Sequence, residues 1–240
     1  MAINPRPWLR VTQVGPVQEP ASTVFSFLIF LVVVYMAQGY RLSWRSGEAA
    51  LMSHLARASV VIWSLTYLMS TLFHTHENVF TERMDYFMPV FAMMSMFVSA
   101  VVSVSPWVRH NAAVAVPALV LPLAAFSLYF MYSMHFVKFD YGWQNKVVGL
   151  FLALQLLVWL PWCVVNARRH AYVKYFFIGH LCIALGAPFE LVDFHPLWQI
   201  FDGHSLWHAV GIPGTYFLFS FSVANSNRLI DEAEKNHLKV

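Results

Sequence analysis

Residues 55–74, LARASVVIWSLTYLMSTLFH, form an apolar stretch whose one Lys, Arg, Asp or Glu side chain is Arg57. About 20 such residues are what an α-helix needs to cross the hydrocarbon core of a bilayer. Backbone polar groups cannot stay unpaired in lipid, so a helix is the physical choice for this stretch. The stretch also carries Ser70 and His74, four residues apart, which a helix places on the same face.

The rest of the chain has the same character. The 240 residues are 59% hydrophobic and 11% charged, whereas soluble proteins carry roughly 25% charged residues. We therefore predict an all-α polytopic membrane protein with one bundle of seven transmembrane helices in residues 22–224, a short polar segment before it (1–21) and a tail after it (225–240). The predicted spans are 22–40, 55–74, 86–105, 112–133, 146–166, 171–192 and 205–224.

The distribution of Lys and Arg predicts the orientation, because cytosolic loops of membrane proteins are enriched in these residues. Five basic residues fall on the side of the N-terminus, namely Arg6, Arg10, Arg83, Lys138 and Lys146. Ten fall on the other side, namely Arg41, Arg45, Arg57, Arg109, Arg168, Arg169, Lys174, Arg228, Lys235 and Lys239. We expect the N-terminus outside or in a lumen and the C-terminus in the cytosol. The net charge of +3 reflects these loops and predicts no nucleic-acid partner.

This topology brings polar residues from distant parts of the sequence to one membrane face. His74 ends the second predicted span, Asp85 precedes the third, and His204 and His208 lie at the start of the seventh. Neutral imidazoles are good zinc ligands, and three protein ligands with one open position describe a catalytic zinc site. Asp85 would serve as general base and acid, and the Ser70 hydroxyl would stabilise an oxyanion. A covalent role for Ser70 is weaker, because no separate base is evident.

Other residues on that face leave alternatives open. His76 and His195 could replace one of the three ligands, although His76 points elsewhere if the helix continues past His74. Glu190 and Asp193 flank the outer end of the sixth span, and ionisable groups near membrane depth are often functional. They could support the metal ligands from a second layer, or form a structural ion pair with Arg83.

Five stretches together resemble a known group of membrane hydrolases. They are QEPASTVFSFL from Gln18, FHTHENVFTERMDYF from Phe73, FDYGWQNKVV from Phe139, WLPWCVVNARR from Trp159, and FELVDFHPLWQIFDGHSLWHAVGIP from Phe189. The pattern resembles the CREST superfamily, which includes alkaline ceramidases and adiponectin-receptor-like proteins, and it looks most like the GPI-remodelling phospholipase (Per1-like) branch. The resemblance implies zinc ligands at His74, His204 and His208, and places the family's Ser and Asp on Ser70 and Asp85.

The function expected from residues and resemblance is a zinc-dependent intramembrane hydrolase that cleaves an acyl ester of a phospholipid or glycophospholipid. A ceramidase-like amide hydrolase remains an alternative. So does a non-catalytic receptor or membrane-remodelling protein with a structural zinc. The expected partner is a membrane lipid in the surrounding bilayer. The expected location is the Golgi or ER membrane in a eukaryote and the cytoplasmic membrane in a prokaryote, with the active site on the lumenal or outer side.

Overall fold

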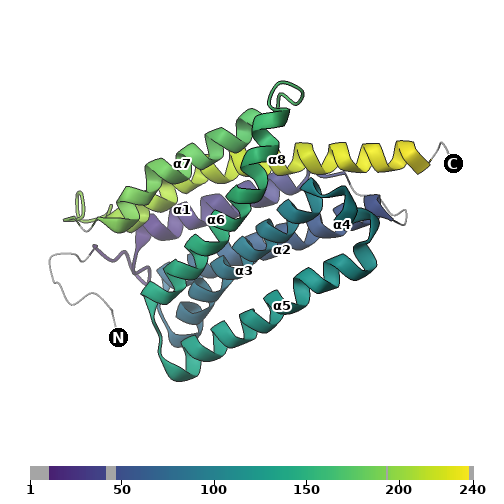
Figure 1. The fold of residues 1–240 in the computed structure, drawn as a ribbon. Helices are drawn as coiled ribbons and strands as arrows, with labels where there is room; N and C mark the ends of the chain where they lie inside the picture. The colour runs from purple at the N-terminus through teal and green to yellow at the C-terminus, as the bar shows by residue number, and fades with distance from the viewer. Residues whose placement is uncertain (1–10, 42–46, 193, 238–240) are drawn as a thin grey trace.

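The computed structural model describes residues 11–41, 47–192 and 194–237, and nearly all of them belong to helices (Figure 1). A long helix lies at each of the seven predicted spans. The elements in chain order are α1 (Pro20–Ala37), α2 (Glu48–Thr75), α3 (Val79–Val104), the short α4 (Pro106–His110), α5 (Ala112–Tyr132), the π-helical turn η2 (Ser133–Val137), α6 (Tyr141–Asn166), α7 (Val173–Leu191) and α8 (Gly203–His237).

Several boundaries differ from the prediction, and α8 differs most. It runs to His237, so the described part of the predicted tail continues the helix beyond residue 224. Leu229 and Ile230 are buried there, in a cluster that also contains Met52 of α2 and Val102 of α3. One face of α8 thus stays apolar beyond residue 224, although most residues of that part of the sequence are polar. Tertiary packing, which a hydropathy average does not register, extends the helix.

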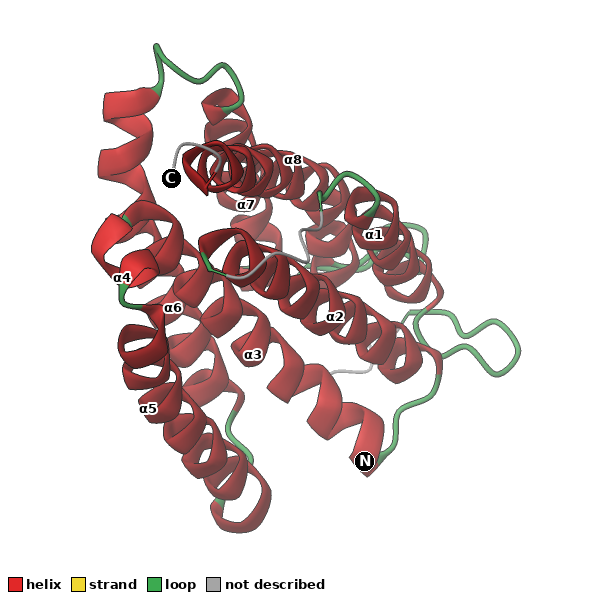
Figure 2. Ribbon diagram, turned by 90° about the vertical axis from the view of Figure 1, so that its right-hand side faces the viewer, coloured by secondary structure: helices red, strands yellow, loops and turns green. Residues whose placement is uncertain are grey.

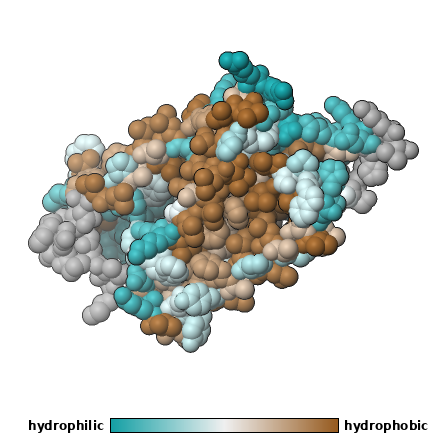
Figure 3. All heavy atoms as spheres, in the orientation of Figure 1, coloured by the Kyte–Doolittle hydropathy of each residue, from teal (hydrophilic) through white to brown (hydrophobic). Residues whose placement is uncertain are grey.

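Among the described residues, five helical stretches are long and apolar enough to cross a membrane: α1, α2, α3, α5 together with η2, and α6. In the space-filling view, hydrophobic side chains cover a broad middle zone, and most hydrophilic ones gather toward the two ends (Figure 3). A lipid environment explains why so many apolar side chains of these helices face outward. The protein is therefore a multi-pass membrane protein, whereas the count of seven spans and the orientation stay predictions.

The helices do not contribute equally to the bundle. α7 packs along α8, while α1 contacts both α2 and α8. Close packing of α7 on α8 depends on small residues, because a Cβ at Gly179 would lie 2.7 Å from Leu218. By contrast, α5 lies at the edge of the bundle (Figure 2), and Phe130 is its one buried side chain. Helices α1, α2, α3, α7 and α8 thus form the tightly packed part of the protein.

The ends of these helices meet at one end of the bundle, on the left in Figure 1. There α2, which ends at Thr75, is followed by α3 after three residues, and α7 ends shortly before α8 begins. The chain entering α1 is joined to the end of α2 by two backbone hydrogen bonds: Gln18 N–H donates to the Thr75 carbonyl, and Glu19 N–H donates to the His74 carbonyl. This end of the bundle carries the candidate site.

Candidate metal site

His74 occupies the last turn of α2, and its side chain is buried. Its Nδ1 atom donates a hydrogen bond to the carboxylate of Glu19 at 2.7 Å. Glu19 immediately precedes Pro20, the first residue of α1, and its backbone is fixed by the hydrogen bond to His74 described above. Helix α1 therefore delivers a carboxylate to the imidazole of α2, and this contact sets the orientation of the ring.

His204 lies in the first turn of α8. Asp202 caps this helix, since its carboxylate accepts a hydrogen bond from Ser205 N–H at 2.8 Å. The start of α8 lies so close to the end of α7 that a Cβ at Gly203 would meet the carbonyl oxygen of Phe189 at 2.2 Å. This close approach brings His204 next to Glu190 of α7, and Nδ1 of His204 donates to the Glu190 carboxylate at 2.7 Å. Tyr141 of α6 donates a hydrogen bond to the same carboxylate.

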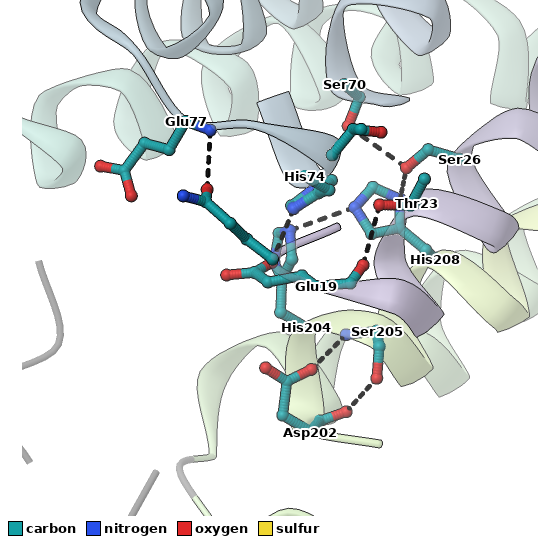
Figure 4. A network of polar contacts seen from close by, with 12 residues as sticks. Glu19, Thr23, Ser26, Ser70, His74, Glu77, Asp202, His204, Ser205 and His208 are labelled. Carbon is teal, nitrogen blue, oxygen red and sulfur yellow. Dashed lines mark hydrogen bonds and ion pairs between the residues drawn. The ribbon is translucent and has the colours of Figure 1, made fainter. Parts of the chain in front are cut away.

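His208 follows one turn later on α8 and is also buried. Its Nδ1 atom lies 3.4 Å from the hydroxyl oxygen of Ser26 on α1. The Ser26 oxygen in turn lies 3.3 Å from the hydroxyl oxygen of Ser70 on α2. All three imidazoles therefore have Nδ1 held by an oxygen atom from another helix or helix approach. Figure 4 shows the contacts of His74 with Glu19 and of His208 with Ser26.

With each Nδ1 held in this way, the Nε2 atoms are left for a common ligand. Nε2 of His204 and Nε2 of His208 are 3.1 Å apart. Nε2 of His74 is buried and has no hydrogen-bond partner among the described residues. The three histidines can offer ligand atoms that all lie within 4.8 Å of one another. Two ligands of a tetrahedral zinc ion are about 3.3–3.4 Å apart, which follows from Zn–N bonds of about 2.0–2.1 Å. The donor set therefore fits a zinc ion, with one coordination position left open.

Asp85 and Ser70 lie beside the histidines. The Asp85 carboxylate lies near the Ser70 side chain and interacts electrostatically with His74 and His204. The structure thus brings together the hydroxyl, the carboxylate and the three imidazoles that the sequence analysis selected. Glu190 also lies here, whereas Asp193 falls outside the described residues.

The other candidate residues lie outside this group of side chains. His76 follows the last residue of α2, and Nδ1 of His195 contacts the Pro196 carbonyl at 3.2 Å. Neither belongs to the group of three histidines that can share a metal. Arg83 pairs with Glu82 and stacks on the Phe139 ring. Glu190 contacts His204 rather than forming the ion pair with Arg83 that the sequence left open.

Sequence reasoning assigned no role to Glu19 or Ser26, although both stand in the QEPASTVFSFL stretch. The sequence features that could indicate their roles are weak. Glu19 is an acidic residue directly before a helix that begins with proline, and Ser26 is a serine in an apolar helix. Partial burial favours the neutral form of Glu19, but the hydrogen bond and charge of His74 and the charge of His204 outweigh it. The pKa of the Glu19 carboxyl therefore lies below its usual value. Glu19 is thus an ionised acceptor for the His74 N–H.

A cavity of about 990 Å³ extends from this site into the bundle. Glu77 and Tyr141 line it near the histidines, and Met52 and Asn225 line its far part. Most of the wall between them consists of apolar and aromatic side chains, such as Trp63, Met93, Leu152, Phe176 and Phe219. The cavity thus joins a polar end, where the histidines converge, to a long and mainly apolar interior.

Comparison with known proteins gives a consistent result. The Per1-like family matches residues 7–226 of the chain. The human protein named GPI-specific phospholipase A2-like PGAP3 is 33% identical over 222 residues, which cover 90% of this chain and 66% of the human protein. Its zebrafish (Danio rerio) counterpart is 31% identical, over 93% of this chain and 69% of its own length. Post-GPI attachment to proteins factor 3 of Drosophila melanogaster is 27% identical, over 82% of this chain and 59% of its own length.

Proposed function

This chain belongs to the Per1-like family, and from that premise we propose that it is a zinc-dependent membrane hydrolase that cleaves an acyl ester of a GPI-type or related phospholipid. The observation that carries the proposal is the arrangement of the three histidines. Each Nδ1 is held by an oxygen atom, the Nε2 side of the rings is left for a metal, and a carboxylate and a hydroxyl lie beside them.

The steps of ester hydrolysis would be shared between the metal and a few side chains. A zinc ion bound here would act as a Lewis acid and lower the pKa of water toward neutrality. Asp85 would accept a proton from the attacking water and return it to the alcohol oxygen that leaves the ester. Ser70 would donate a hydrogen bond to the oxyanion that develops on the ester carbonyl. Glu19, Glu190 and Ser26 would keep the imidazoles oriented without touching the substrate.

The cavity supports a lipid as the substrate. A scissile ester at the histidines would place its acyl chain in the mainly apolar interior described above. The relatives named GPI-specific phospholipase A2-like favour a glycophospholipid among the possible lipids. With the predicted orientation, the substrate would lie in the outer or lumenal leaflet. A purely structural zinc site has no need of an open position flanked by Asp85 and Ser70, which favours an enzyme over a receptor.

Mass spectrometry of lipids incubated with the purified protein tests this proposal. Phospholipids, GPI lipids and ceramides are supplied in separate reactions, before and after treatment with a chelator and after zinc is restored. We expect a fatty acid and a lysolipid from an ester substrate, loss of both with chelator and recovery with zinc. Release from ceramide alone would replace the ester assignment with an amide one. Absence of hydrolysis from every lipid with full zinc occupancy would favour the non-catalytic alternative.

A further inference from the structure

Gln155 lies in the middle of α6, and its side chain is almost completely buried, with 1% of the residue exposed. Neither the oxygen nor the nitrogen of its amide has a hydrogen-bond partner among the described residues. A buried amide without partners is strongly disfavoured, and buried polar atoms in folded proteins are nearly always paired with protein or ordered water. Gln155 lines the cavity, so we expect the hydrogen-bond partner of its amide to lie in the cavity.

His180 of α7 presents the complementary case. Its Nδ1 atom lies 2.8 Å from the backbone carbonyl oxygen of Phe176. A carbonyl can only accept, so Nδ1 carries the proton. A buried imidazolium without a counter-ion would be costly, so the ring is neutral and Nε2 is an acceptor. That Nε2 atom is buried, has no partner among the described residues, and belongs to a side chain that lines the same cavity.

The two side chains lie at a similar depth. Trp159 is one turn beyond Gln155 on α6, and Phe176 is one turn beyond His180 on α7, both away from the metal site. These two aromatic residues pack in one cluster around Phe221 of α8. Ten residues of α7 separate Glu190 from His180, which corresponds to about 15 Å along a helix. The pair is therefore distinct from the histidine site.

We propose that Gln155 and His180 form a second polar subsite, within the cavity, that binds one uncharged hydroxyl group. The hydroxyl would donate its hydrogen bond to Nε2 of His180 and accept one from the amide nitrogen of Gln155. A hydroxyl matches both side chains, because Nε2 of His180 only accepts, the Gln155 amide can donate and accept, and neither side chain carries a charge. The hydroxyl belongs either to an ordered water molecule or to the acyl chain of the lipid substrate. The lipid source rests on the proposed function, whereas the subsite itself does not.

The first test measures thermal unfolding in nanodiscs made of phospholipids with unsubstituted acyl chains, which water alone can complement. Replacement of an unpaired amide by an apolar side chain stabilises a protein, whereas loss of a satisfied one destabilises it. If water occupies the subsite, we expect Gln155→Leu to lower the unfolding temperature by about 2–6 °C. Gln38→Leu, at the exposed end of α1, controls for the chemical change and should have little effect. The proposal is wrong if Gln155→Leu instead raises the unfolding temperature both in nanodiscs of unsubstituted lipids and in nanodiscs of hydroxylated lipids.

A second measurement is made on the wild-type protein, so its result does not depend on the stability of Gln155→Leu. Nitrogen-15 NMR of wild-type protein labelled at histidine reports whether Nε2 of His180 accepts a hydrogen bond, with His180→Leu used for assignment. If water supplies the hydroxyl, we expect Nε2 of His180 to show the chemical shift of a hydrogen-bonded acceptor already in unsubstituted lipids. If the acyl chain supplies it, this shift should be seen only after hydroxylated lipid is added. The shift of a free Nε2 under both conditions would overturn the subsite.

Kinetics distinguish the two sources of the hydroxyl. Phospholipids with and without a hydroxyl in the middle of the scissile acyl chain are compared as substrates. If the lipid supplies the group, wild type should prefer the hydroxylated chain by about 2–12-fold in kcat/KM, the value of one hydrogen bond, and Gln155→Leu should abolish the preference. If water supplies it, both chains react alike while the stability and NMR effects persist in unsubstituted lipid. Complete inactivity would refute the proposed function and leave the stability and NMR tests valid.

Discussion

The carboxylate of Glu19, just before α1, accepts a hydrogen bond from Nδ1 of His74, at the end of α2, over a distance of 2.7 Å. The contact between Glu190 and His204 repeats this geometry at the same distance. Metal-binding histidines commonly donate their second ring N–H to a carboxylate, which fixes the tautomer and strengthens the ligand. Two of the three imidazoles are therefore oriented for metal binding by acidic residues from other parts of the chain.

The Glu19–His74 contact leads to the first prediction. Glu19→Ala should lower zinc affinity by about 10–100-fold, because the His74 ring loses the acceptor that orients it. Competition with a fluorescent chelator measures the affinity. Glu77→Ala serves as the control, since Glu77 lines the cavity nearby and its side chain has no hydrogen bond or ion pair with the three histidines among the described residues. Equal affinity in wild type and Glu19→Ala would show that the contact has no part in metal binding.

The second prediction concerns metal content. We expect one zinc ion per chain in the wild-type protein and loss of most of it in His208→Ala, because one of three protein ligands is removed. Elemental analysis of purified protein gives the stoichiometry. His195→Ala should retain the metal, since His195 lies outside the group of convergent histidines. Full occupancy in His208→Ala would refute the assignment of the ligands.

The third prediction separates chemistry from metal binding. Asp85→Asn should keep its zinc and lose about 10²–10⁴-fold in the rate of lipid hydrolysis, the usual cost of removing a general acid or base. Zinc content and lysolipid production are measured on the same preparation. An active Asp85→Asn variant would transfer the proton-transfer role to Glu190 or Asp193.

Ser70 gives a fourth prediction. Ser70→Ala should retain zinc and lose up to about 10²–10³-fold in rate, as expected for one donor to an oxyanion. Mass spectrometry of the protein during turnover provides a second readout. An acyl group attached to Ser70 would show that the serine is a nucleophile and that the proposed water mechanism is wrong.

A fifth prediction concerns Gly203, where a Cβ would collide with the Phe189 carbonyl. Gly203→Ala should destabilise the protein by about 1–3 kcal/mol, as overpacking does, and reduce zinc occupancy by displacing His204. Thermal unfolding and elemental analysis measure the two effects. Gly149→Ala is the matched control, because no neighbouring atom lies within 4 Å of its Cβ position. A stable, fully metallated Gly203→Ala protein would contradict this account of how α8 is placed.

The sequence predicted the position of each long helix, because hydropathy reports lipid-facing segments directly. It also predicted which histidines come together, because the spacing of His204 and His208 and the topology place them near His74. It did not predict how far α8 extends, since Leu229 and Ile230 are buried by neighbours from α2 and α3.

The supporting residues were less predictable for a related reason. Glu190 lies 14 residues from its histidine, and the sequence analysis selected it. Glu19 lies 55 residues from His74, and Ser26 lies 182 residues from His208. Their roles depend on the packing of α1 against α2 and α8. No local sequence pattern indicates which distant helices will pack together.

The site draws Glu19 and Ser26 from α1 and its approach, and His204 and His208 from α8. The ribosome makes α1 long before it makes α8. Until α8 has been made and has packed against α1, His74 lacks its two partner imidazoles. The growing polypeptide therefore cannot assemble the three-histidine site before α8 is made, and the site forms only when α1, α2 and α8 have met.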